Sequence, residues 1–349
     1  MSLMADACSV MHAKMLPVKN LGFNHSGSRI FSNLSFGNNT PTSLPCLSLS
    51  KEKQQHSNYN HNVIGMSGRR ATKLNAAVIP LEAAEVRLDV PVKVEKLYTT
   101  TVVSVETLVG PKGGLGEVCH IVLDHGGSFC FTEGQYLIVH FQSIKRYFSI
   151  ASCSSGDTFD GKTLSLCVRR AELLPDSVSN FLCNVKAGDT VEISGPSGGK
   201  MVFEEDRKIN SKHIMVATAT GVAPFRSNIQ RIFLTNLLGN TDNIWLISGA
   251  DNYNSLLYDK EFTQIQNGNI ERFRYQRALN NSVDDSIYGS GDEIFTLLND
   301  GAYIYIAGSN TMLPGIKDTF AKIAQERGVD WPKMLEELQK NNQWRVEVY

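Results

Sequence analysis

The sequence predicts two domains, an antiparallel β-barrel or sandwich followed by an α/β domain with a parallel sheet. The length of 349 residues is enough for about two domains. Between residues 98 and 203, short runs of β-branched and aromatic residues are separated by Gly, Asp and Pro, a pattern typical of antiparallel strands. From residue 213 onward, apolar strand cores alternate with segments of helical period, which indicates a parallel sheet with crossover helices.

We expect the first domain at residues 95–204 and the second at residues 212–349, joined by a polar run near residues 204–211. The six expected strands of the first domain lie at residues 99–103, 119–123, 136–141, 147–151, 164–168 and 190–193. The expected strand cores of the second domain lie at residues 214–217, 244–247 and 303–307. A helical period over Ile316, Phe320 and Ile323 predicts a helix that ends before Gly328.

Composition excludes several classes of protein. Hydrophobic residues make up 42% of the chain and charged residues 20%, which is not the composition of a disordered or fibrous protein. The formal net charge of −1 gives no support for binding nucleic acid through bulk charge. No window approaches the roughly 18 to 20 uninterrupted apolar residues of a membrane span, so we expect no transmembrane segment.

Residues 1–75 differ from the rest of the chain. They contain eight basic residues against two acidic ones, are rich in Ser and Asn, and lack the continuous apolar core of a secretory signal. This composition predicts an organelle transit peptide and linker, with cleavage between residues 66 and 76. A disordered polar tail is the alternative.

The cysteines favour a reducing compartment. Seven of them stand at positions 8, 46, 119, 130, 153, 167 and 183, and no pair has CxxC spacing. Two lie in the expected transit peptide, which leaves an odd number in the folded part. We therefore expect neither a disulfide framework nor a metal site.

Residues 146–152 form a strand with candidate binding chemistry. Alternation places Arg146 and Phe148 on one face of the strand and Tyr147 and Ser149 on the other. A cation beside an aromatic ring and a hydroxyl suits a ligand that carries both a phosphate and a flat heterocycle. A plain barrel strand is the alternative for this segment taken alone.

Two later segments suit phosphate groups, and a third ends the chain. Residues 177–182 are typical of a helix N-terminus, where free N–H groups and Ser hydroxyls can hold a pyrophosphate. Residues 217–226 run from a strand through a turn of small residues into a helix with an early proline. An ordinary Ser cap and an ordinary turn are the alternatives. The last residue, Tyr349, is expected to pack on something.

Together and in this order, the four segments resemble the plant-type ferredoxin–NADP reductase family, and most closely its root-type plastid members. The resemblance covers residues 95–349. Its further matching segments are residues 109–112, 124–127, 159–163, 255–259, 314–318 and 346–349.

The resemblance implies a Greek-key β-barrel that binds FAD, an α/β domain that binds NADP(H), and a plastid location. In this family a ferredoxin exchanges single electrons with the flavin, which exchanges hydride with the nicotinamide. By position, Arg146 would hold the FAD pyrophosphate, Ser149 would lie beside flavin N5, and Phe148 and Tyr349 would flank the isoalloxazine. Glu347 would serve the proton and electron-transfer site.

The resemblance thereby assigns three sets of residues. The implied catalytic residues are Ser149, Glu347 and Tyr349. The implied flavin-binding residues are Arg146, Tyr147, Phe148, Cys167, Arg169, Ser177, Ser179, Thr220 and Tyr349. The implied nucleotide-binding residues are Arg169, Thr220, Gly221, Asn280, Asn281, Tyr288, Gly308 and Met312.

The chain departs from the family pattern mainly at the nicotinamide nucleotide. Ala219 replaces a glycine of the phosphate turn, and Ala307 replaces the cysteine beside the nicotinamide. Asn280 and Asn281 replace a Ser-Arg pair, and Ser286 replaces a lysine, so two cations expected to face the 2′-phosphate are missing. We therefore predict weakened or altered NADP(H) use, with NAD(H) as an alternative. Two arginines of an expected strand, Arg274 and Arg277, are candidates to compensate.

The segments that correspond to the family's flavin-binding loops are also shorter in this chain. Leu173 stands where the family has a tyrosine that stacks on adenine, so FMN is an alternative to FAD. The candidate basic rim for an acidic ferredoxin consists of Lys93, Lys96, Lys112, Lys317 and Lys322. Two other functions remain open, an enzyme recruited to a small molecule of specialised metabolism and a degenerate flavin-binding or assembly protein.

Overall fold

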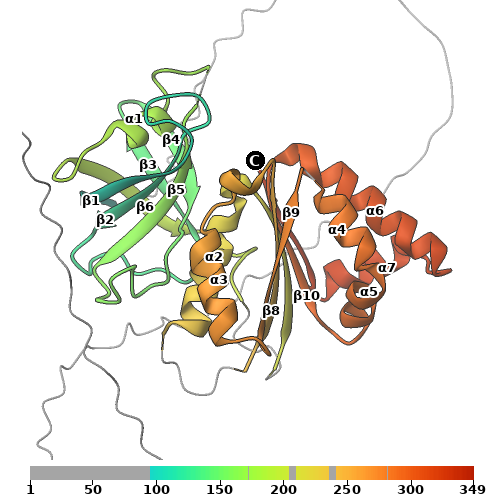
Figure 1. The fold of residues 1–349 in the computed structure, drawn as a ribbon. Coiled ribbons are helices and arrows are strands. Elements are labelled where there is room, and N and C mark those ends of the chain that lie inside the picture. Colours follow the sequence, from blue (N-terminus) through green and yellow to red (C-terminus); the bar gives the residue numbers. More distant parts are fainter. Residues whose placement is uncertain (1–94, 172, 204–209, 236–240, 281) are drawn as a thin grey trace, which may run out of the picture. The chain divides into compact units, whose positions relative to one another are not determined.

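A computed structural model describes residues 95–171, 173–203, 210–235, 241–280 and 282–349 (Figure 1). The expected transit peptide at residues 1–75, Lys93, Asn281 and most of the expected linker at residues 204–211 lie outside the described residues.

The first half of the described chain forms an antiparallel sheet of six strands. The strands are β1 (Leu97–Val109), β2 (Val118–Asp124), β3 (Tyr136–Phe141), β4 (Ile144–Ser149), β5 (Thr163–Arg169) and β6 (Thr190–Ser197). Their order is β4-β3-β6-β1-β2-β5, and every pair is antiparallel. An antiparallel bridge between Ile150 and Leu166 joins the two ends of this order. The sheet thereby closes on itself, which decides the barrel against the sandwich.

All six strands expected in the first half are present. β4 begins three residues before the expected start at residue 147 and ends two residues early. Inside the barrel, alternate residues of the strands form a core around Ile121, Leu137, Val139 and Ile193, all of which are fully buried. The short helix α1 (Val178–Asn184) packs against this core through Val178 and Leu182.

The second half forms a parallel sheet of five strands in the order β11-β10-β7-β8-β9. The strands are β7 (Lys212–Thr218), β8 (Asn243–Ala250), β9 (Phe273–Leu279), β10 (Tyr303–Gly308) and β11 (Trp344–Val348). The helices are η1 (Ala219–Val222), α2 (Ala223–Phe233), η2 (Tyr253–Ser255), α3 (Asp259–Gly268), α4 (Val283–Gly289), α5 (Gly291–Asn299), η3 (Asn310–Met312), α6 (Leu313–Glu326) and α7 (Trp331–Lys340).

Helices cover both faces of the parallel sheet. Figure 1 shows α2 and α3 on one face and α4 to α7 on the other. The first face buries residues such as Met215 and Leu246 against α2 and α3, whereas the second buries Ile214 and Ile247 against α4 to α6. Such a two-sided sheet is the α/β arrangement that the alternating pattern predicts.

The barrel and the parallel sheet share one apolar core. Ala151 and Cys167 of the barrel lie in the same buried cluster as Ala217, Val222 and Phe225 of the second half. No helix among the described residues is long and apolar enough to cross a membrane.

Candidate functional site

The candidate site begins at the carboxyl edge of the parallel sheet. β7, β10 and β11 end there side by side, because Gly308 pairs with Val348 and Ala307 pairs with Ala217. In open α/β sheets this edge is where ligands bind. It brings together three of the segments singled out in the sequence, namely the turn after β7, the turn after β10 and the last residue of the chain.

The turns at this edge approach one another so closely that two glycines are required. A Cβ at Gly221 would lie 2.3 Å from the carbonyl oxygen of Ala307, and a Cβ at Gly308 would lie 2.4 Å from Oγ1 of Thr218. Gly308 also has a φ of +141°. No larger residue fits at either position, so backbone atoms line the edge.

Ala219 adopts a conformation that glycine favours. Its φ is +47°, in the left-handed region, where a Cβ is unfavourable. From the sequence we expect Ala219 to add bulk where a family glycine stands, and the structure adds that the alanine also strains the turn. Its neighbour Thr218 donates a hydrogen bond from Oγ1 to Sδ of Met312 at 2.9 Å, which joins this turn to the one after β10.

Tyr349 is fixed by its backbone while its ring stays accessible. Its N–H donates to the carbonyl of Gly308 at 3.1 Å, and its own oxygen accepts from the N–H of Asn310 at 3.0 Å. Its hydroxyl lies 2.5 Å from Oγ1 of Thr220. The residue is nevertheless 57% exposed. The expected packing of Tyr349 is therefore limited to this hydroxyl contact and the terminal backbone pairing.

A hydrogen bond connects the barrel to the carboxyl edge of the sheet. Ser149, at the end of β4, donates from Oγ to Oε1 of Glu347 on β11 at 3.2 Å. Burial raises the pKa of Glu347, while the hydrogen bond from Ser149 and the charge of Lys200 oppose that rise. The carboxyl of Glu347 is therefore biased toward its protonated form, beside a hydroxyl that can pass a proton on.

The two faces of β4 differ as the sequence predicts. Phe148 pairs with the fully buried Leu137 and packs against the barrel core. Tyr147 is on the opposite face, 64% exposed, with its ring edge-to-face to Tyr136 at 5.3 Å. Arg146 is exposed, and no described residue forms an ion pair with it.

Ser177 caps α1, as its position in the sequence predicts. Its Oγ accepts from the N–H of Asn180 at 3.2 Å. Ser179 and Cys167 are buried, whereas Arg169 is exposed at the end of β5. The hydroxyls of Ser177 and Ser179 are therefore less exposed than the sequence suggests. Among the implied flavin-binding residues, Arg146 and Arg169 are the exposed charged groups.

The two arginines considered as substitutes for the missing cations are engaged elsewhere. Arg277 pairs with Asp259 at 2.5 Å. Arg274 pairs with Glu293 at 2.7 Å and stacks on the ring of Trp245. A phosphate group would have to break these contacts to recruit either arginine.

Tyr288 of the implied nucleotide set lies among charged side chains of α6. Its hydroxyl donates to both carboxylate oxygens of Glu326, at 2.9 and 3.1 Å. Nζ of Lys322 lies 4.0 Å from the centre of its ring. Lys322, a candidate of the ferredoxin rim, thus belongs to the surroundings of Tyr288. Asn280 has a φ of +59°, and its N–H donates to the carbonyl of Asp251.

Sequence reasoning missed a buried ionic network around Arg226, the last residue of the strand–turn–helix segment. The Arg226 guanidinium pairs with Asp157 and Glu261, each at 2.8 Å, and donates to the carbonyl of Ala151 at 3.0 Å. Burial alone would raise the pKa of Asp157, but a hydrogen bond from His120 and the charge of Arg226 outweigh it and lower that pKa. The network joins the first turn of α2 to the barrel. Its only sequence signal is a charged residue near the start of an expected helix.

The side chains at this site suit a flavin nucleotide. Arg146 and Arg169 supply exposed positive charge for phosphates, and Tyr147 and Tyr349 expose large aromatic surfaces to which a flat heterocycle can bind. Ser149, Glu347 and Thr220 add polar atoms, Ser149 on the same strand as Tyr147 and Thr220 in contact with Tyr349. Both the flavin and a pyridine nucleotide are compatible with this set.

Comparison with known proteins gives concordant results. Residues 215–318 match the family described as the oxidoreductase NAD-binding domain. The chain is 41% identical to the embryo isozyme of chloroplastic ferredoxin–NADP reductase from Oryza sativa subsp. japonica, over 99% of this chain and 100% of that protein. It is 43% identical to the root-type isozyme from Nicotiana tabacum, over 83% of this chain and 86% of that protein.

Solved structures agree with the fold. Ferredoxin–NADP⁺ reductase from Plasmodium falciparum aligns with a TM-score of 0.60 at 22% identity, over 72% of this chain and 96% of that one. The same reductase with 2′P-AMP aligns with a TM-score of 0.59 at 22% identity, over 74% of this chain and 99% of that one.

Proposed function

The chain belongs to the ferredoxin–NADP reductase family, and we propose that it moves electrons between a bound flavin, a pyridine nucleotide and a one-electron carrier such as ferredoxin. It is a flavin-dependent oxidoreductase. The observation that carries the proposal is the contact of Ser149 with Glu347 beside the exposed ring of Tyr349, because it places proton-handling groups and an aromatic ring together. Neither the recruited enzyme nor the degenerate binding protein is favoured by these findings.

We assign the flavin to residues 95–204 and the nucleotide to residues 212–349. FAD, when bound, supplies the one-electron and two-electron chemistry that side chains lack. Arg146 and Arg169 would neutralise its phosphates, and Tyr147 and Phe148 lie on the strand that would carry its rings. Because Leu173 is exposed and contributes no aromatic ring, FMN stays an alternative at this site.

Glu347 and Ser149 would handle the proton. A carboxyl whose pKa is raised by burial retains its proton closer to neutral pH than an exposed glutamate does. When Glu347 carries its proton, the contact can reverse, so that the carboxyl O–H would donate to Oγ of Ser149 and the Ser149 hydroxyl would donate its own proton to a ligand on β4. The pair would therefore move a proton between Glu347 Oε1 and the flavin-binding face.

The ring of Tyr349 would occupy the nicotinamide position and would move away when the nicotinamide binds. Its backbone pairs with Gly308 and Asn310, so the end of β11 stays in place when the ring moves. The ring itself is restrained within the described residues by the hydrogen bond with Thr220 and is otherwise largely exposed. Displacing it would cost about one hydrogen bond, of order 1 kcal/mol.

We further propose that selectivity for NADPH over NADH is weaker than the family pattern implies. Two observations support this, the replacement of the cationic residues at Asn281 and Ser286, and the engagement of Arg274 and Arg277 in ion pairs. The location of the protein is the plastid, since the similar embryo and root isozymes of Oryza sativa subsp. japonica are named chloroplastic. Residues 1–75 are the proposed transit peptide.

Electron transfer from NADPH to ferredoxin tests the function. Purified protein supplied with FAD should reduce ferredoxin when NADPH is added, and Ser149→Ala should slow this by roughly 10²-fold because the proton path is broken. Ser128→Ala, in the exposed loop after β2, is the matched control and should leave the rate unchanged. Equal rates for the two variants would contradict the proposed role of Ser149, and no ferredoxin reduction by the unaltered protein would contradict the function.

A further inference from the structure

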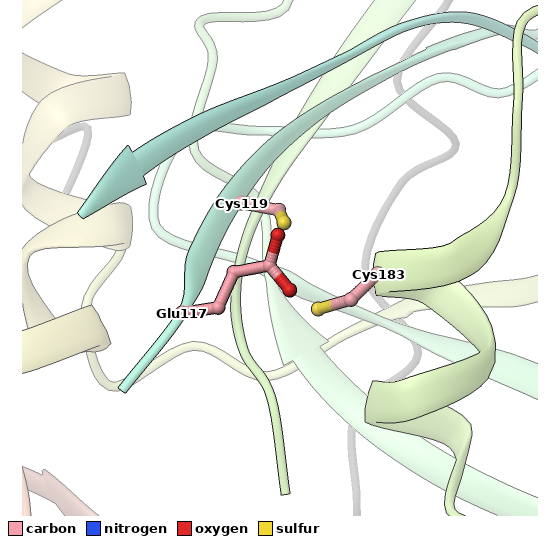
Figure 2. Close-up of side chains that lie close together, drawn as sticks. All are labelled: Glu117, Cys119 and Cys183. Carbon is pink, nitrogen blue, oxygen red and sulfur yellow. The ribbon is translucent and has the colours of Figure 1, made fainter. Parts of the chain in front are cut away.

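A cluster of two cysteines and a glutamate lies inside the barrel half. Glu117 precedes β2, Cys119 belongs to β2 and Cys183 belongs to α1 (Figure 2). One carboxylate oxygen and the two sulfur atoms all lie within 4.8 Å of one another. Glu117 and Cys119 are fully buried, and Cys183 is 5% exposed. Three groups with this chemistry can form either a metal site or a reactive thiol pair.

Both carboxylate oxygens of Glu117 already accept hydrogen bonds, which argues against a metal site. Its Oε2 accepts from Nε of Arg170 at 2.6 Å and from the N–H of Gly113 at 2.9 Å, and its Oε1 accepts from Thr107 at 3.1 Å. A divalent ion would have to share this carboxylate with the Arg170 guanidinium, and two cations on one buried carboxylate repel each other. The remaining ligands would be two sulfur atoms only.

The two thiols are well placed to react with each other. Neither is in a disulfide, and Figure 2 shows both sulfur atoms close to the Glu117 carboxylate, one from β2 and one from α1. Cys183 is the more accessible of the two, its carbonyl accepts from Arg170 at 3.3 Å, and its thiol donates to the carbonyl of Val168 at 3.8 Å. An adjacent guanidinium stabilises a thiolate.

The electrostatics of the pair distinguish the two cysteines. A hydrogen bond with Cys119 and the charge of Arg170 lower the pKa of Cys183 against the effect of burial. The same hydrogen bond, together with burial, raises the pKa of Cys119. Of the two thiols, Cys183 therefore loses its proton more readily than Cys119 does.

We propose that Cys119 and Cys183 form a redox-active dithiol that hydrogen peroxide oxidises to a disulfide, with Cys183 as the attacking group. The Cys183 sulfur attacks one peroxide oxygen, the O–O bond breaks, and Cys183 becomes a sulfenic acid while the other oxygen leaves as water. The Cys119 sulfur then attacks the Cys183 sulfur, the S–S bond forms, the S–O bond breaks, and the departing hydroxide takes the Cys119 proton. In total, two thiols and one peroxide give one disulfide and two waters.

The disulfide would tie β2 to α1. Arg170 already connects these elements, since it binds Glu117, the Cys183 carbonyl and Oδ1 of Asn184. Ser177, at the other end of α1, is among the residues assigned to the flavin. The disulfide would therefore act on the helix whose N-terminal cap is assigned to the flavin. The proposal does not depend on the assigned electron-transfer activity.

Peptide mapping after mild oxidation tests the proposal. The reduced full chain is treated with equimolar hydrogen peroxide, alkylated and digested without reductant. We expect one cross-linked peptide that joins positions 119 and 183, with the loss of two hydrogen atoms. In Cys119→Ser and Cys119→Val, the cross-link should vanish and dimedone should trap a sulfenic acid on Cys183. Cys153→Ser, which alters another buried thiol, is the matched control and should leave the cross-link intact.

Two results would overturn the proposal. If exposure alone controls oxidation, Cys130 will react while both Cys119 and Cys183 remain open to alkylation after unfolding. If the cluster is a metal site, the purified protein will contain one equivalent of zinc that protects both thiols from peroxide. Testing two variants at position 119 separates a lost cross-link from misfolding, because valine preserves an apolar side chain in the core.

Discussion

At the scale of single residues, Glu347 is a titratable group of the site that departs from ordinary surface behaviour. It combines burial, which raises its pKa, with a hydrogen bond from Ser149. The sequence resemblance implied both residues, but only the structure shows their contact. They lie 198 positions apart in the chain, and no periodicity in either segment reports on a contact between two domains.

The raised pKa of Glu347 predicts a pH dependence of stability. Between the unfolded value of about 4.5 and the higher folded value, the native state binds more protons than the unfolded state. The free energy of unfolding should therefore be highest, relative to Glu347→Gln, below pH 4.5 and should fall as the pH rises through the folded pKa. Urea denaturation of the unaltered protein and of Glu347→Gln, from below pH 4.5 to neutral pH, measures this difference in the free energy of unfolding. The exposed Glu337→Gln is the control. A difference between the two proteins that rises with pH would contradict the burial account.

Coenzyme selectivity is also decided by single residues. The triple variant Asn280→Ser, Asn281→Arg, Ser286→Lys should raise the ratio of kcat/KM for NADPH over NADH by about 10-fold or more, since each charge-assisted contact is worth roughly 1.5–3 kcal/mol. The matched control is Asn269→Arg, which adds a cation in the turn after α3. Strong selectivity for NADPH in the unaltered protein would show instead that another cation, such as Lys322 beside Tyr288, binds the 2′-phosphate.

At the scale of elements, the sequence predicts the strands well and their ends less well. Short runs of β-branched and aromatic residues, separated by Gly, Asp and Pro, identify all six barrel strands. β11 is not among the expected strands, since Arg345 and Glu347 interrupt its apolar run. The ionic network around Arg226 cannot be predicted from the sequence, for a different reason. Its partners Asp157 and Glu261 come from distant segments, and only the folded chain brings their charges together.

The turn between β7 and α2 predicts a stabilising substitution. Ala219 has a positive φ, so Ala219→Gly should increase the free energy of unfolding by about 1 kcal/mol through relief of that strain. Thermal unfolding of the two proteins measures the change. Ala223→Gly, at the helical start of α2, is the control and should destabilise by a similar amount. A loss of stability in Ala219→Gly would show that the alanine methyl makes contacts that outweigh the strain.

The ionic network predicts that the junction between the barrel and α2 depends on Asp157. Asp157→Asn removes a charge from buried Arg226 and should lower the free energy of unfolding by about 2 kcal/mol at neutral pH. Because the pKa of Asp157 is lowered, its contribution should be present above pH 3.8 and should be lost as the pH falls. Asp300→Asn, at an exposed helix end, should cost almost nothing. Equal stability of the two variants would mean that Glu261 alone neutralises Arg226.

At the scale of the whole molecule, both halves contribute residues to the candidate site. The barrel contributes Arg146 and Ser149, and the parallel sheet contributes Glu347, Tyr349 and the close-packed turns of its carboxyl edge. The fold and the family follow from the sequence because patterns within each half are local. Coenzyme selectivity does not follow from the sequence, because charges near the expected nucleotide site, such as Lys322 beside Tyr288, come from another helix and are placed only by folding.

The absorbance spectrum of the purified protein before and after NADPH tests the central claim most directly. We predict a yellow protein whose flavin absorbance bands NADPH bleaches slowly, because Ala307 and Ala219 alter the position of the nicotinamide. Added ferredoxin should then restore the flavin bands. Dithionite should bleach the bands without delay. Arg146→Ala should be colourless, because the flavin phosphates lose their cation. A colourless unaltered protein that takes up neither FAD nor FMN, or flavin bands that dithionite bleaches and NADPH leaves unchanged, would contradict the account.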